Sequence, residues 1–78
     1  MSPTFKNEKG YGFSIFSNEE HRIHIHVFKD TNSAKIWLEP IVEIAENRGF
    51  SDKEIKMIIT ITKENEKEFK EKYRAHIG

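Results

Sequence analysis

The first fifty residues alternate apolar and polar side chains with a period of two, which predicts short β-strands. In the clearest run, 23–29 (IHIHVFK), an apolar set alternates with a set rich in histidine. The apolar set is Ile23, Ile25 and Val27, and the second set is His24, His26 and Phe28. Because successive side chains of a strand point to opposite faces, this run predicts a sheet with one apolar face and one histidine face.

Several other segments of this half have the same character. The runs 11–17 and 34–39 also alternate, and the turn-rich DTNS at 30–33 separates two of the strands. The short segment 4–6 can pair with 11–17 across NEKG. We interpret 41–46 as a fourth strand rather than a first helical turn, although the proline before it interrupts pairing.

The pattern becomes helical after NRGF. Ser51 and Glu54 form a capping-box signature, which places a helix start at this point. Apolar residues then recur at steps of three and four, and one helix over 52–75 is the economical interpretation. The alternative is a break near TKENEK, because the apolar stripe thins between Thr62 and Phe69.

These elements predict one domain, 1–78, of the α+β class: an antiparallel sheet of three or four strands with one long C-terminal helix packed on one face. The sheet residues expected beneath the helix are Phe13, Ile15, Ile25, Val27, Ile36 and Leu38. The histidines should then lie on the face away from the helix.

Composition limits the function classes. Thirteen basic and thirteen acidic residues cancel, which argues against nonspecific binding to a phosphate backbone. The chain has no cysteine, which excludes disulfides, zinc–thiolate sites and a thiol nucleophile. No apolar run approaches the ~20 residues of a membrane span, and MSPTFKNEKG has no signal-peptide core. We therefore expect a cytoplasmic protein.

His24 and His26 share a strand face, with side chains about 6.5–7 Å apart along the backbone. Such a pair can bind one metal ion, zinc above all, with a third ligand from elsewhere. The candidate third ligands are His21, His76, Glu19, Glu20 and Glu39. Alternatively, the pair can act as acid and base in a hydrolase or ribonuclease, because imidazole titrates near neutral pH.

A different interpretation uses the aromatic residues. Phe28, Trp37 and Phe16 share the histidine face, where they form either a small second core or an exposed binding surface. An aromatic–histidine surface suits a protein partner, and it can also stack the bases of single-stranded RNA. Neutral net charge favours the protein partner.

The chain resembles a small bacterial family, domain-of-unknown-function family 4160, in SNEEHRIHIHV (17–27), AKIWLEP (34–40) and IAENRGFSDKEI (44–55). The family signature reads His-Pro-Pro-His-Val-His-Val. The matching positions here are His21, His24, His26 and Val27. Arg22 and Ile23 replace the two prolines, which should loosen the approach to the strand.

The resemblance implies a functional context. Family members tend to be encoded beside a second small protein, in an arrangement like a toxin–antitoxin pair. We therefore expect a protein partner, with RNA as an alternative and homo-oligomers left open. The expected binding residues are His21, His24, His26, Phe28, Trp37, Lys35 and Arg22. An enzyme centred on His24 and His26, or a metal-binding accessory protein, are the competing hypotheses.

Overall fold

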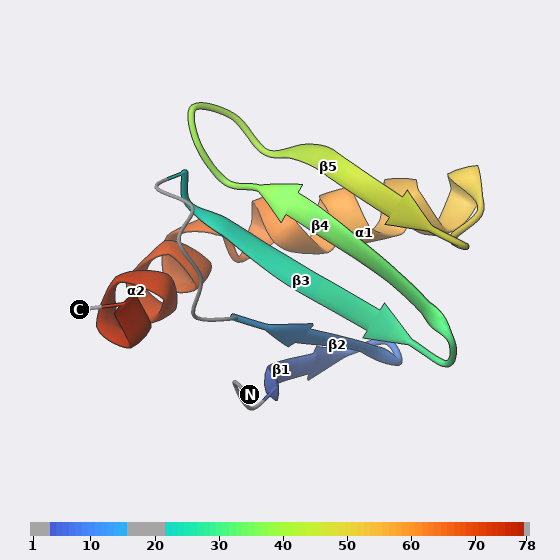
Figure 1. Cartoon of the computed structure of the whole chain (residues 1–78), viewed down its shortest axis with the longest axis horizontal. Coiled ribbons are helices and arrows are strands. Elements are labelled where there is room, and N and C mark those ends of the chain that lie inside the picture. The colour runs from blue at the N-terminus through green and yellow to red at the C-terminus, as the bar shows by residue number, and fades with distance from the viewer. Residues whose placement is uncertain (1–3, 16–21, 78) are drawn as a thin grey trace.

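The structure is a computed structural model that describes residues 4–15 and 22–77. Its strands are β1 (Thr4–Glu8), β2 (Tyr11–Ser14), β3 (His24–Lys29), β4 (Asn32–Trp37) and β5 (Glu43–Arg48). Its helices are α1 (Asp52–Glu64) and α2 (Glu66–Ile77). Over the described residues the α+β class is confirmed, with an antiparallel sheet in chain order (Figure 1). The predicted three or four strands were too few, since the sheet has five, and the single long helix is replaced by two.

The first hairpin follows the predicted pairing. β1 runs antiparallel to β2 with Glu8 opposite Tyr11, so only Lys9 and Gly10 make the turn. Both turn residues have positive φ, at 53° and 86°. Two-residue turns of this type match the right-handed twist of the flanking strands, which explains why so short a connection closes the hairpin.

The last strand begins two residues later than predicted. The prediction placed it at 41–46, whereas β5 spans Glu43–Arg48. Ile36 pairs with Ile44 and Lys35 with Glu46, so Ala45 is an extra residue that forms a β-bulge. The bulge reverses the alternation, and the side chains after it change face. Glu46 therefore lies opposite Lys35, on the face away from Ile36 and Ile44.

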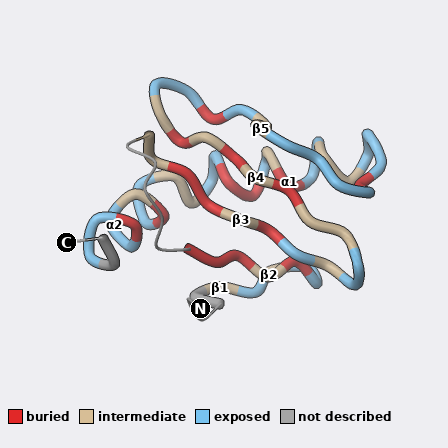
Figure 2. The backbone as a smooth tube through the Cα atoms, viewed as in Figure 1, coloured by how far each residue is buried: buried red, intermediate tan, exposed pale blue. Residues whose placement is uncertain are grey.

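The predicted apolar face is confirmed as the core. Its central members are completely buried: Phe13, Ile25, Val27, Ile36 and Leu38. They pack against buried residues of the two helices, namely Ile58, Ile61, Phe69 and Tyr73. Figure 2 shows the buried segments concentrated in the middle strands and on the inner sides of the helices. α1 runs along one face of the sheet, and α2 lies at the end where β2 ends and β3 begins (Figure 1).

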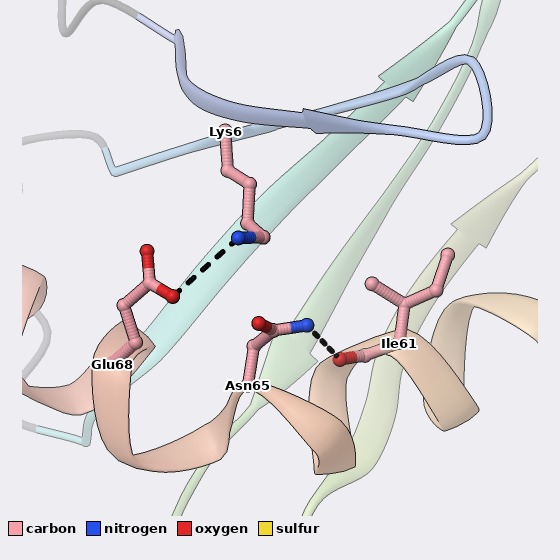
Figure 3. A network of polar contacts seen from close by, with 4 residues as sticks. All are labelled: Lys6, Ile61, Asn65 and Glu68. Carbon is pink, nitrogen blue, oxygen red and sulfur yellow. Dashed lines mark hydrogen bonds and ion pairs between the residues drawn. The ribbon is translucent and has the colours of Figure 1, made fainter.

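The C-terminal segment bends at Asn65, inside the stretch where the sequence indicated an alternative break. The Asn65 backbone N–H and the side-chain Nδ2–H both donate to the carbonyl of Ile61, at 3.1 and 2.8 Å (Figure 3). After the bend, the ring of Phe69 lies 5.2 Å from that of Phe13. Lys6 Nζ of β1 approaches Glu68 Oε1 of α2 at 3.4 Å (Figure 3). The bend therefore lets α2 dock on the first hairpin.

The predicted helix start is also confirmed. The Glu54 backbone N–H donates to Ser51 Oγ at 3.2 Å, and the Ser51 backbone N–H donates to Glu54 Oε1 at 3.0 Å. This is a reciprocal capping box. Within the described residues, neither α1 nor α2 has the length and apolar character of a membrane-crossing helix.

Gly49 provides a test of the junction between β5 and α1. Its φ is 104°, and a Cβ added there would lie 2.2 Å from Oδ1 of Asn32. We expect Gly49→Ala to lower the free energy of unfolding by more than about 1 kcal/mol, measured by urea denaturation. Gly10→Ala is the matched control, because Gly10 has a similar φ of 86° but its Cβ would meet only the flexible side chain of Lys29, at 3.5 Å. Asn32→Ala in the Gly49→Ala background should recover part of the loss, and no recovery would contradict the proposed clash.

Ser51→Ala tests the helix cap. The substitution removes the acceptor for the Glu54 amide, so it should cost about 0.5–2 kcal/mol. Amide hydrogen exchange over 52–55 should become faster, while exchange within β3 should follow only the global loss of stability. Unchanged exchange over 52–55 would mean that the cap does not stabilise the first turn.

Candidate functional site

One face of the sheet is turned away from the core, and it carries most of the side chains that the sequence assigned to the histidine face. We call it the open face. Its residues are His26, Phe28, Ser33, Lys35, Trp37, Glu43, Glu46 and Arg48. The strand register arranges them in rows across β3, β4 and β5. His26 lies opposite Lys35 and Phe28 opposite Ser33.

A continuous row of rings crosses this part of the sheet. The centroid distances are 5.7 Å from Trp37 to His24, 5.3 Å from His24 to His26, and 6.4 Å from His26 to Phe28. The first two contacts are edge-to-face, whereas the His26 and Phe28 rings are nearly parallel, at 15°. The predicted gathering of histidine and aromatic side chains is therefore present, and it ends at the exposed ring of Phe28.

His24 does not occupy the position predicted for it. Its side chain is only 1% exposed, and its ring lies 5.7 Å from the ring of Tyr73 in α2. The prediction that both imidazoles lie away from the helix is therefore wrong for His24. The reason is its position as the first residue of β3, at the end of the sheet where α2 lies (Figure 1). Strand periodicity says nothing about which helix covers the end of a sheet.

A hydrogen bond fixes the orientation of this buried ring. Nδ1 of His24 lies 2.9 Å from the carbonyl oxygen of Arg22. Since a carbonyl can only accept, Nδ1 carries the hydrogen and donates. His26 is partly exposed and lies among the residues of the open face. This arrangement weakens the hypothesis that His24 and His26 act as a paired acid and base. A catalytic group must reach its substrate, whereas His24 is buried.

Arg22 holds the approach to β3 in place. Its Nε donates to the Glu39 carbonyl at 2.7 Å, and its Nη2 contacts Glu43 Oε1 at 2.6 Å. Its guanidinium carbon also lies 4.4 Å from the centre of the Trp37 ring. The side chain of Arg22 joins the approach to β3 to the connection between β4 and β5. That the loss of the two signature prolines loosens this approach stays a prediction.

Two cations contact the ring of Trp37. Lys35 Nζ is 4.5 Å from the ring centre, and Arg22 approaches at a similar distance. Lys35 precedes Trp37 by two residues, while Arg22 is bonded to the carbonyl of Glu39, two residues after it. Cation–π contacts of this kind orient the ring, and they leave less of its surface for stacking a ligand.

A hollow of about 250 Å³ lies on the open face. It is lined by His26, Phe28, Ser33, Ala34, Lys35, Glu46 and Arg48. Of these, the sequence predicted the contribution of His26, Phe28 and Lys35. It did not place Glu46 or Arg48 on this face, because the bulge at Ala45 decides which side chains of β5 point to it.

A larger hollow, about 610 Å³, lies along the bend between the helices. Its lining is Glu64, Asn65, Lys67, Glu68, Glu71, Lys72 and Ala75. These side chains are mostly exposed and of mixed charge, as on the solvated face of an amphipathic helix. It contains neither an aromatic ring nor a deeply buried polar group, so we assign the site to the smaller hollow.

Several of the predicted site residues are not placed. His21, Phe16, Glu19 and Glu20 lie outside the described residues, as does the side chain of His76. Over the part of the chain that the structure describes, no three side chains of the metal-binding types come together. The third ligand proposed for His24 and His26 is therefore not found among those residues.

The chain belongs to the family described as Domain of unknown function (DUF4160), whose model matches residues 10–74. The match includes the whole of β2 to α1 and most of α2. It confirms the resemblance carried by the histidine motif. No curated protein and no solved structure matches the chain.

The burial of His24 leads to a prediction about stability. His24→Ala should lower the free energy of unfolding by at least about 2 kcal/mol, because it leaves a cavity and removes a donor from the Arg22 carbonyl. His26→Ala, at a partly exposed position, should cost about 1 kcal/mol or less. Each kcal/mol lowers the melting temperature of a domain of this size by about 4–8 °C, so thermal unfolding separates the two variants.

Two further variants separate the causes of the loss at His24. Asn can present its amide N–H near the position of Nδ1, so His24→Asn tests the hydrogen bond. Leu has no donor but fills space, so His24→Leu tests the cavity. Equal melting temperatures for His24→Ala and the wild type would show that the ring contributes nothing to stability.

Proposed function

We propose that this protein works in a two-gene, toxin–antitoxin-like module and binds its protein partner through the open face. The observation that carries the proposal is the row of rings that ends at Phe28 beside a hollow. Phe28 is 37% exposed although it belongs to the middle strand of the sheet. An exposed aromatic side chain next to a depression is a common anchor point of protein interfaces.

The charges around the hollow support a protein rather than a nucleic acid. Arg22 is paired with Glu43 at 2.6 Å, and Arg48 has Glu46 at 3.8 Å. Nucleic-acid surfaces need cations that are free to neutralise successive phosphates. Here the acidic side chains lie among the basic ones, and the formal net charge of the whole chain is +0. RNA is therefore the less favoured ligand.

The position of the open face also supports binding. The core lies on the opposite side of the sheet, where Ile25, Val27 and Ile36 carry the packing. Side chains such as Phe28 and Arg48 can therefore be selected for a partner without disturbing the core. We propose that the protein works in the cytoplasm, as the composition predicts. Its proposed partner is the protein encoded by the adjacent gene.

Co-purification tests the proposal. The tagged protein is co-expressed with the untagged product of the adjacent gene, and the partner recovered per mole of tagged protein is measured. Phe28→Ser should reduce recovery at least about tenfold, because loss of a central aromatic anchor costs more than about 1.4 kcal/mol. Met57→Ser is the matched control, since Met57 is an equally exposed apolar side chain, at 36%, on α1.

Two outcomes contradict the proposal. If the wild type retains none of the adjacent gene product, there is no such complex. If Met57→Ser loses the partner and Phe28→Ser keeps it, the interface lies on the helical side. Circular dichroism of both variants confirms that each is folded.

A further inference from the structure

We infer that the exposed side of the two helices binds the phosphates of duplex DNA, on a surface separate from the open face. A hollow of about 440 Å³ lies there, and every side chain that lines it is charged: Lys63, Glu64, Glu66, Lys67, Lys70 and Arg74. We call it the basic hollow. It shares no residue with the hollow on the open face, so DNA and the proposed protein partner can be bound at the same time.

The lining of the basic hollow has an excess of positive charge. It contains four cationic and two anionic side chains, which leaves two positive charges after every lining carboxylate is counted. Lys70 Nζ lies 2.7 Å from Glu66 Oε2, so this pair is neutral. Among the residues that the structure describes, no ion pair or hydrogen bond engages the side chain of Lys63, Lys67 or Arg74. Three unpaired cations and one carboxylate therefore remain.

The cations form a row along the helices. Lys67, Lys70 and Arg74 are separated by three and four residues, which places them on one face of α2. Lys63 lines the same hollow from the other side of the bend at Asn65. At about 1.5 Å per residue, the row is roughly 16 Å long. Each strand of duplex DNA carries one negative charge per about 3.4 Å of helix axis, so a row of this length can contact several phosphates.

The charges next to the basic hollow do not cancel this excess. Glu68 and Glu71 line the larger hollow, and Glu68 is paired with Lys6. Lys56 is exposed on α1, seven residues before Lys63, a spacing that keeps both on one helix face. Adding Lys56 and Glu71 to the count leaves the excess of two positive charges unchanged. The neutral net charge of the whole chain limits the affinity for DNA, but it does not remove this local excess.

The chemistry of the lining favours the backbone of duplex DNA. Protein interfaces are depleted in lysine and glutamate at their core, and no apolar side chain lines the basic hollow. Single-stranded nucleic acids stack on exposed aromatic rings, whereas the rings of Phe69 and Tyr73 in α2 are buried. Duplex RNA is recognised partly through its 2′-hydroxyls, and the lining has no neutral hydrogen-bonding side chain. Phosphates of duplex DNA need only the cations that are present.

Titration with a DNA duplex of about 12 base pairs tests this inference. Chemical shifts of backbone amides in the ¹⁵N-labelled full chain report where the duplex binds. We expect shifts within 63–74 and a dissociation constant of about 10⁻⁴ M at about 50 mM NaCl, because few phosphates are neutralised. The logarithm of the association constant should fall with the logarithm of the salt concentration, with a slope of about −2 to −3.

Neutral substitutions test the role of the cations. Lys63→Gln combined with Arg74→Gln should weaken binding at least about fivefold and reduce the salt slope by about one for each cation removed. Lys72→Gln is the matched control, because Lys72 is also an exposed lysine of α2 but lines the larger hollow. It should change the affinity less than about twofold. Glu64→Gln should strengthen binding, because it removes the carboxylate that opposes the unpaired cations.

Several results would overturn the inference. These are no binding at low salt, shifts confined to the strands, or equal losses in the double variant and in Lys72→Gln. Tighter binding of an RNA duplex, of dodecauridylate or of hexaglutamate would identify a different ligand and equally overturn it. Circular dichroism checks that the variants are folded, and Lys63→Gln alone serves if the double variant is not. Co-purification through Phe28 is a separate measurement, so a failure to bind DNA leaves the proposed function standing.

Discussion

The buried ring of His24 is the point on which the arrangement of the site depends. It lies at the first position of β3, covered by Tyr73, with Trp37 and His26 at its edges. An imidazole removed from water must keep its polar atoms bonded, since a buried polar group without a partner costs about 1–3 kcal/mol. The donation from Nδ1 to the Arg22 carbonyl meets part of that requirement. The same hydrogen bond fixes the orientation of the His24 ring, which contacts both Trp37 and His26 in the row of rings.

Arg22, which accepts this hydrogen bond, also joins two segments that are distant in sequence. The backbone of Arg22 accepts from His24, while its side chain reaches Glu39 and Glu43 on the far side of β4. One residue therefore holds the entry to β3, the connection between β4 and β5, and the position of the Trp37 ring. Where the family signature has proline, with its restricted backbone, this chain has an arginine that restrains the segment through side-chain contacts.

Much of the fold could be predicted because burial on one face of a sheet imposes a strict period of two. The assignment of Ile25 and Val27 to the core follows from that period alone, and the capping box at Ser51 is a local signal. The bulge at Ala45 and the bend at Asn65 could not be placed with the same certainty, since both depend on packing between distant elements. His24 shows the same limit: its periodicity is that of an outward residue, but α2 covers it.

The bend at Asn65 connects the core to the candidate site. Phe69 and Tyr73 are four residues apart, so they lie on one side of α2. The first contacts Phe13 in the core, and the second contacts His24 in the row of rings. A straight continuation of α1 would carry α2 in another direction and could not make both contacts. The histidine motif alone therefore does not define the site, because the C-terminal helix covers His24, whereas His26 stays partly exposed.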